Sequence, residues 1–114
     1  QFVRPGLPAN LYQPLPDARD AEQFTTLQAR PGVQVERIVT RGQVTPVEAP
    51  YDQAHDEWVL LLAGAARLWC EGSGEVALAP GDHLLIPAGV RHRVTWTPPD
   101  RETIWLALHF TDQG

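Results

Sequence analysis

One carboxylate stands at the start of the most apolar stretch of the chain. Glu57 precedes an unbroken apolar run, residues 58–63, which ends at Gly64. Four to eight apolar residues ended by glycine are typical of a buried strand. Alternate residues of a strand share a face, so Glu57 points the same way as Val59 and Leu61. A carboxylate on a buried face must be hydrogen-bonded, paired with a cation or bound to a metal, which makes Glu57 the first candidate functional residue.

The other reactive side chains narrow the possible chemistry. All nine basic residues are arginine, so no lysine is present to form a Schiff base with a carbonyl substrate. Cys70 is the one cysteine, which excludes an internal disulfide and favours a reducing, cytoplasmic location.

The size and charge of the chain exclude several classes of partner. Its 114 residues are enough for one domain and too few for two. A net charge of −5 at pH 7, with no basic run, argues against nucleic acid and against an anionic membrane. We expect no membrane-spanning segment and no signal peptide, because no apolar stretch has the required length and flanks. A small-molecule ligand is the expected partner.

Short apolar segments separated by glycine and proline turns predict an all-β fold. Prolines at 5, 8, 14 and 16 prevent regular structure near the start. We therefore expect an extended N-terminal arm over residues 1–23, with one helical turn over 17–23 that Asp17 caps, and a single barrel domain over 24–114. Strands are expected over 24–29, 33–40, 43–47, 57–62, 65–70, 75–78, 83–86, 91–96 and 103–110.

Two of the expected strands are apolar on both faces, which is more than the interior of one small barrel requires. In the last strand, one face carries Ile104, Leu106, Leu108 and Phe110, and the other carries Trp105, Ala107 and His109. The outer apolar face must be covered, either by the N-terminal arm or by a second subunit. We expect a homodimer, with Trp58 or Trp105 near the covered face.

Two segments resemble the two halves of the cupin signature. Glu57, followed seven positions later by Gly64, is similar to the end of the first motif. Gly81, Pro87, Gly89 and His92 have the spacing G-x5-P-x-G-x2-H of the second motif. The chain looks like a small single-domain cupin over about residues 40–110. The resemblance implies a double-stranded β-helix, or jelly-roll barrel.

The resemblance also implies a divalent metal ion, such as zinc, iron, manganese or nickel. Cupins hold it with two histidines and a glutamate from the first motif and one histidine from the second. Glu57 and His92 match two of these ligands. The two first-motif histidines are replaced by Tyr51 and Gln53. The Gln53 amide oxygen, or the Asp52 carboxylate after a one-residue shift of the turn, could supply a further oxygen ligand.

Further side chains are weaker candidates for the same site. His55 is either a ligand or a rim residue that contacts the substrate. His109 is either a ligand or a core histidine that is hydrogen-bonded at both ring nitrogens. Tyr51 and His55 are the candidate acid–base residues. Tyr51 and Trp96 are both expected to project into the cavity that holds Glu57 and His92.

Two functions of different classes agree with these residues. The first is a metal-dependent enzyme, of isomerase, lyase or dioxygenase type, that acts on a small polar molecule. The second is a metal-free module that binds a sugar or a small acid. In that module Gln53, Glu57 and His92 would hydrogen-bond the ligand, and Tyr51 and Trp96 would stack on it.

Overall fold

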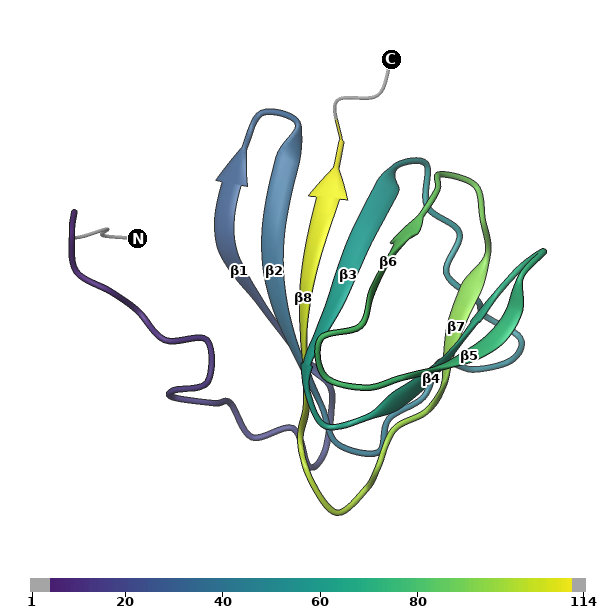
Figure 1. Cartoon of the computed structure of the whole chain (residues 1–114), viewed down its shortest axis with the longest axis horizontal. Coiled ribbons are helices and arrows are strands. Elements are labelled where there is room, and N and C mark those ends of the chain that lie inside the picture. The colour runs from purple at the N-terminus through teal and green to yellow at the C-terminus, as the bar shows by residue number, and fades with distance from the viewer. Residues whose placement is uncertain (1–4, 112–114) are drawn as a thin grey trace.

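The chain folds into two antiparallel sheets, as a computed structural model shows (Figure 1). The structure describes residues 5–111, so the outermost residues of the expected arm and barrel, 1–4 and 112–114, lie outside it. The strands are β1 (Gln23–Arg30), β2 (Val33–Thr40), β3 (Asp56–Ala63), β4 (Ala66–Cys70), β5 (Gly74–Leu78), β6 (His83–Ile86), β7 (His92–Trp96) and β8 (Thr103–Phe110). The larger sheet has the order β1-β2-β8-β3-β6 and the smaller one β5-β4-β7. The all-β prediction is confirmed.

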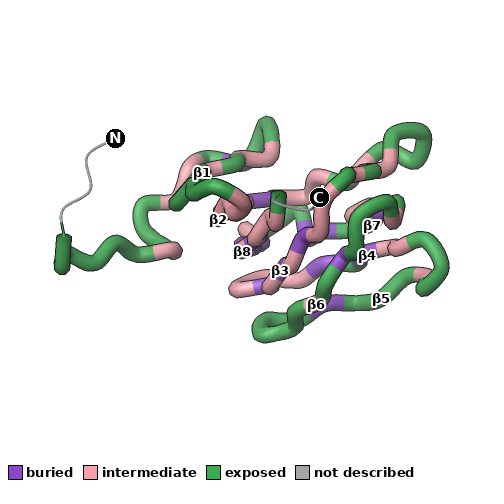
Figure 2. Tube along the Cα trace, turned by 90° about the horizontal axis from the view of Figure 1, so that it is seen from above, coloured by how far each residue is buried: buried purple, intermediate pink, exposed green. Residues whose placement is uncertain are grey.

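The apolar strand β3 lies in the larger sheet between β8 and β6. Its residues alternate as expected: Glu57, Val59 and Leu61 are buried, whereas Trp58 and Leu60 are half-buried. The inward residues of β3 join a core cluster with side chains from both sheets, namely Ala66, Leu68, Leu78, Ile86 and Trp105. Burial of this apolar surface, at about 25 cal/mol per Å², is the main force that holds the sheets together. In Figure 2 the buried segments lie on strands of both sheets.

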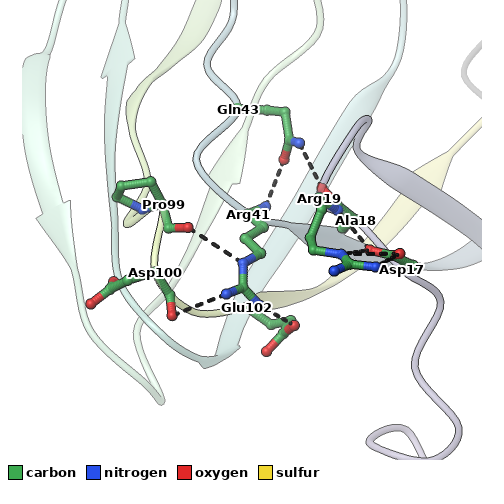
Figure 3. Close-up of polar contacts among 8 residues, drawn as sticks. All are labelled: Asp17, Ala18, Arg19, Arg41, Gln43, Pro99, Asp100 and Glu102. Atoms are coloured by element: carbon green, nitrogen blue, oxygen red, sulfur yellow. Dashed lines mark hydrogen bonds and ion pairs between the residues drawn. The ribbon is translucent and has the colours of Figure 1, made fainter.

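The root of the arm is fastened to the barrel by polar contacts (Figure 3). The Gln43 amide donates to the Ala18 carbonyl at 2.7 Å and accepts the Arg41 backbone N–H at 2.6 Å. The helical turn predicted over residues 17–23 is wrong. Instead, the Asp17 carboxylate accepts the backbone N–H of Arg19 at 3.0 Å, which forms a local turn that competes with a helix.

Arg41 fastens the same region to the turn before β8 (Figure 3). Its guanidinium donates to the carbonyls of Pro99 and Asp100 and to the Glu102 carboxylate at 2.9 Å. The arm therefore leaves the barrel from a rigid base. Beyond this base, residues 11–14 contact Arg37 of β2, whereas residues 5–10 are exposed and extend away from the sheets (Figures 1 and 2).

The strand predicted over residues 43–47 does not form. Thr45 donates its backbone N–H to the Val94 carbonyl at 2.8 Å and accepts the Val94 N–H on its hydroxyl at 3.0 Å. The next residue, Pro46, has no N–H with which to continue a ladder. The segment instead runs as a loop to Tyr51, which pairs through its backbone with His92.

The outer surface of the larger sheet carries an apolar patch. One row of directly paired residues crosses four strands: Val35, Leu108, Trp58 and Leu85. Leu106 and Leu60 form the next row, and we call these six residues the outer apolar face. Arg37 borders it and donates to the arm carbonyls of Leu11 and Pro14 at 3.2 and 3.4 Å. The arm thus crosses the β1–β2 side of this surface. Leu85 on the other side is 53% exposed.

Candidate functional site

A cavity of about 370 Å³ lies between the two sheets. Its polar lining consists of Glu22, Gln34, Glu36, Tyr51, Gln53, His55, Glu57, His92, His109 and Thr111, and its apolar lining of Phe24, Ile38, Val59, Leu68, Ile86, Val94 and Trp105. A concave, largely apolar space with a group of polar side chains is typical of a small-molecule site.

Glu57 and His92 meet in this cavity from different sheets. Glu57 Oε1 lies 3.7 Å from His92 Nε2, and the side chains are 11% and 6% exposed. The Nδ1–H of His92 donates to the Val90 carbonyl at 3.1 Å, so Nε2 is the nitrogen that faces Glu57. Burial by itself would lower the pKa of His92, but the neighbouring Glu57 carboxylate and the hydrogen bond to Val90 raise it above its ordinary value.

The loop before β3 adds an aromatic ring and an amide. Tyr51 stacks on His92, with ring centroids 5.4 Å apart. Gln53 is fixed because its backbone carbonyl accepts the N–H of Gly89 at 2.7 Å. The side-chain oxygen of Gln53 is buried and has no hydrogen-bond partner in the described structure. A buried acceptor of this kind is costly unless a bound molecule supplies a donor.

A second imidazole–carboxylate pair faces the cavity from the larger sheet. His109, which lies opposite Glu57 in the β3–β8 register, donates from Nε2 to the Glu36 carboxylate at 3.1 Å. Its Nδ1 lies 2.9 Å from His55 Nε2, so the three side chains form a continuous hydrogen-bonded chain. The bond to Glu36 raises the pKa of His109 above its ordinary value despite partial burial.

The sequence predictions missed two glutamates of the cavity, Glu22 and Glu36. Glu22 accepts a hydrogen bond from the Thr40 hydroxyl at 2.8 Å, and Thr40 in turn accepts the indole N–H of Trp105 at 3.1 Å. Burial raises the pKa of Glu22. The alternation of β2 could have shown that Glu36 and Ile38 share a face. No local signal showed that this face lies inside the barrel.

Other predicted residues lie away from the cavity. Asp52 is exposed and does not line it, whereas Gln53 does. The fourth histidine of the chain, His83, also lies away from the cavity, on the outside of the larger sheet against Trp58. The prediction that Trp96 projects into this cavity is wrong. A register irregularity between β4 and β7 reverses the alternation after Val94, so Trp96 pairs with exposed Arg67 and is 43% exposed.

The donor set does not fit the four-ligand metal site that the two motifs together would ordinarily provide. Within residues 5–111, no group of three or more His, Cys, Asp or Glu side chains could hold a metal ion. Glu57 and His92 are two suitable donors, and Gln53 could add only a neutral oxygen. His55 and His109 are hydrogen-bonded to each other through ring nitrogens, so one nitrogen of each ring is already engaged.

Replacing Glu36 with glutamine is expected to flatten the pH dependence of stability. The folded-state pKa of His109 is raised by Glu36, so its contribution to the free energy of unfolding is fully present below the unfolded pKa of about 6.5 and is lost as the pH rises through the folded pKa. The destabilisation by Glu36→Gln should therefore be largest near pH 6 and should shrink toward about pH 9. Urea unfolding of the wild type and the variant between about pH 6 and pH 9 measures this difference in the free energy of unfolding.

Glu75→Gln is the matched control for this experiment. Glu75 is an exposed carboxylate paired with Arg67, whose charge does not change in this pH range. Its effect should be independent of pH. Parallel pH profiles for the wild type and Glu36→Gln would contradict the role given to the His109–Glu36 pair.

Comparison with known proteins identifies the family. The cupin domain model matches residues 36–109. A candidate mannose-6-phosphate isomerase from Ralstonia eutropha shares 40% identity, with 91% of this chain and 97% of that chain covered and a TM-score of 0.86. A cupin superfamily protein from Desulfitobacterium hafniense shares 18% identity, with 86% and 84% covered and a TM-score of 0.72.

A third solved structure, a DMSP lyase from Ruegeria pomeroyi, shares 23% identity and has a TM-score of 0.67. The match covers 80% of this chain and 47% of the lyase chain. At this low identity the likeness supports the fold alone. No functionally curated protein matches the chain. No helix in the described part of the chain is long and apolar enough to cross a membrane. The family match and the 40% identical structure confirm the resemblance seen in the sequence: this chain belongs to the cupin domain family.

Proposed function

We propose that this cupin binds a small polar molecule in the cavity and exchanges protons with it. The observation that carries the proposal is the pair of imidazole–carboxylate contacts, His92–Glu57 and His109–Glu36, which face one cavity from different sheets. A carboxylate beside an imidazole orients the ring and stabilises its charged form. Each pair can therefore take up or release a proton near neutral pH.

Two such groups in one cavity suit an isomerase or a lyase. In an isomerisation a base removes a proton and an acid returns one, and in an elimination a base removes a proton and an acid protonates the leaving group. Neither reaction requires an oxidant. His55 is a further participant, because its Nε2 continues the chain through His109 to Glu36. Tyr51 is the further proton donor, because its ring stacks on His92. The name of the 40% identical relative, a candidate isomerase, agrees with this class of reaction.

Ligand binding is tested by thermal shift with sugars, small acids and amines, each in the presence of a chelator. A ligand at 100 times its dissociation constant stabilises the fold by about 2.7 kcal/mol. We expect a ligand to raise the Tm of the wild type and of His83→Asn, because His83 lies outside the cavity. The same ligand should not stabilise His92→Asn.

Proton exchange is tested with the ligand found in that screen. In deuterated water, NMR should show that wild-type protein replaces a carbon-bound proton of the ligand with deuterium. Binding without exchange would reduce the function to that of a binding or sensing module. A Tm that rises with zinc, iron, manganese or nickel and falls with chelator would instead support the metal-dependent enzyme.

We further propose that the chain consists of an arm (1–23) and a barrel (24–114), and that two copies associate through the outer apolar face. The arm contacts that surface near Arg37. Within residues 5–111, no hydrogen bond joins the arm to the row from Leu108 through Trp58 to Leu85, and Leu85 is 53% exposed. A contiguous apolar row on a sheet surface is a typical contact between subunits, and a twofold axis would bring the same row from both copies together.

A further inference from the structure

We infer that the cavity selects molecules that are rich in hydrogen-bond donors and carry no negative charge, and that it discriminates against phosphorylated sugars. The inference rests on the proposed small-molecule function and specifies the class of ligand. It depends on which charged groups line the cavity and on where every described arginine lies.

The charged lining of the cavity is dominated by carboxylates. Glu22, Glu36 and Glu57 all contribute to it, and no described arginine does. The buried side-chain oxygen of Gln53, which has no hydrogen-bond partner, adds a fourth group that can accept a hydrogen bond from a ligand. Sugars and amines supply O–H and N–H donors to such groups. A phosphate or carboxylate supplies only acceptors and negative charge.

The histidines do not give the cavity a net positive charge. His55 and His109 share one hydrogen bond between ring nitrogens, so only one proton lies between them, and together they carry at most one positive charge. A protonated His92 adds a second charge. Against these stand three carboxylates. Burial raises the pKa of Glu22, yet even a neutral Glu22 leaves the cavity without net positive charge.

The described arginines are all engaged elsewhere. Five are paired with carboxylates outside the cavity: Arg19 with Asp17, Arg41 with Glu102, Arg67 with Glu75, Arg91 with Glu71, and Arg101 with Asp100. Arg30 and Arg37 donate to backbone carbonyls, and Arg93 lies over the Trp69 ring. The described residues also form no helix, so no helix N-terminus is present to bind phosphate. Proteins ordinarily recognise phosphate with one of these groups.

The expected ligand of this chain differs from the substrate class in the name of its relative. That name specifies a phosphorylated sugar, mannose 6-phosphate. The lining described here predicts that an unphosphorylated sugar is the better ligand. Phe24 provides a direct way to change the charge, because it lines the cavity and is 54% exposed.

The experiment is calorimetric titration with matched pairs, mannose against mannose 6-phosphate and glucose against glucose 6-phosphate, at about pH 8, where a phosphate monoester carries about two negative charges. For the wild type we expect the phosphorylated member to bind roughly tenfold or more weakly. Phe24→Arg should reduce the ratio of the two dissociation constants, phosphorylated to unphosphorylated sugar. Val47→Arg should leave this ratio unchanged, because Val47 is 72% exposed and does not line the cavity. Equal or tighter binding of the phosphate by the wild type would overturn the inference.

A second measurement is independent of any natural ligand. A cationic amine nitroxide and an anionic carboxylate nitroxide are added separately, and the broadening of histidine NMR signals is compared. The cation should broaden His92 and His109 more strongly than the anion, relative to exposed His83. Equal or stronger broadening by the anion would refute the charge selection. If no tested sugar or amine binds but the cation is preferred, the proposed function fails and the charge selection stands.

Discussion

Gly64→Ala is expected to lower the free energy of unfolding by about 2–5 kcal/mol. Gly64 has φ +85°, and a Cβ there would lie 2.6 Å from the Thr103 hydroxyl and 2.7 Å from the Glu102 carbonyl. Thr103 cannot easily move, because it is fully buried and its hydroxyl donates to the Ala65 carbonyl. The β3–β4 turn would have to separate from the start of β8. Urea denaturation gives the measurement.

Gly74→Ala is the matched control, because Gly74 has the same φ of +85° and a Cβ there would meet no atom within 4 Å. It should show the conformational cost alone, about 1–2 kcal/mol. Equal losses in the two variants would show that the close approach at Gly64 relaxes without cost. The comparison also gives a physical reason for the glycine that ends the first cupin motif: β8 passes too close for a side chain.

Leu108→Glu is expected to convert a dimer into a monomer. Leu108 lies between Val35 and Trp58 in the four-residue row of the outer apolar face. Association would bury a carboxylate from each copy against apolar side chains, which costs several kcal/mol when no cation pairs with it. Light scattering at high micromolar concentration should give twice the chain mass of 12.6 kDa for the wild type and the single chain mass for the variant.

Val47→Glu provides the control for this second prediction. It places the same charge in an exposed loop, where Val47 is 72% exposed, and it should leave the measured mass unchanged. Urea unfolding checks that Leu108→Glu still folds. A monomeric wild type at the same concentration would refute the proposed association and would leave the covering of this face to another partner.

The strands were the most predictable part of the molecule, because their signals are local. Alternation and an ending glycine were enough to orient Glu57, Val59 and Leu61 correctly. The failures came where a single residue interrupts the pattern. Pro46 prevents a strand over 43–47 that would otherwise pair with Val94, and the irregularity after Val94 turns Trp96 outward.

The site was less predictable, because it depends on which strands become neighbours. The motif spacing indicated Glu57 and His92, and the structure places these two side chains together. The contact between His109 and Glu36 joins residues 73 positions apart in the sequence. It exists because β8 is inserted between β2 and β3, and nothing in the local sequence of either residue specifies that order.

The position of β8 also affects how the chain can fold during synthesis. Because β8 pairs along its length with both β2 and β3, a nascent chain that stops before residue 103 leaves β2 and β3 each with an open edge. Such edges pair readily with other chains. The ribosome must therefore release nearly the whole domain before the larger sheet can close, and folding by long-range pairing of this kind is slow. Until then, the open edges of β2 and β3 stay available for pairing with other chains.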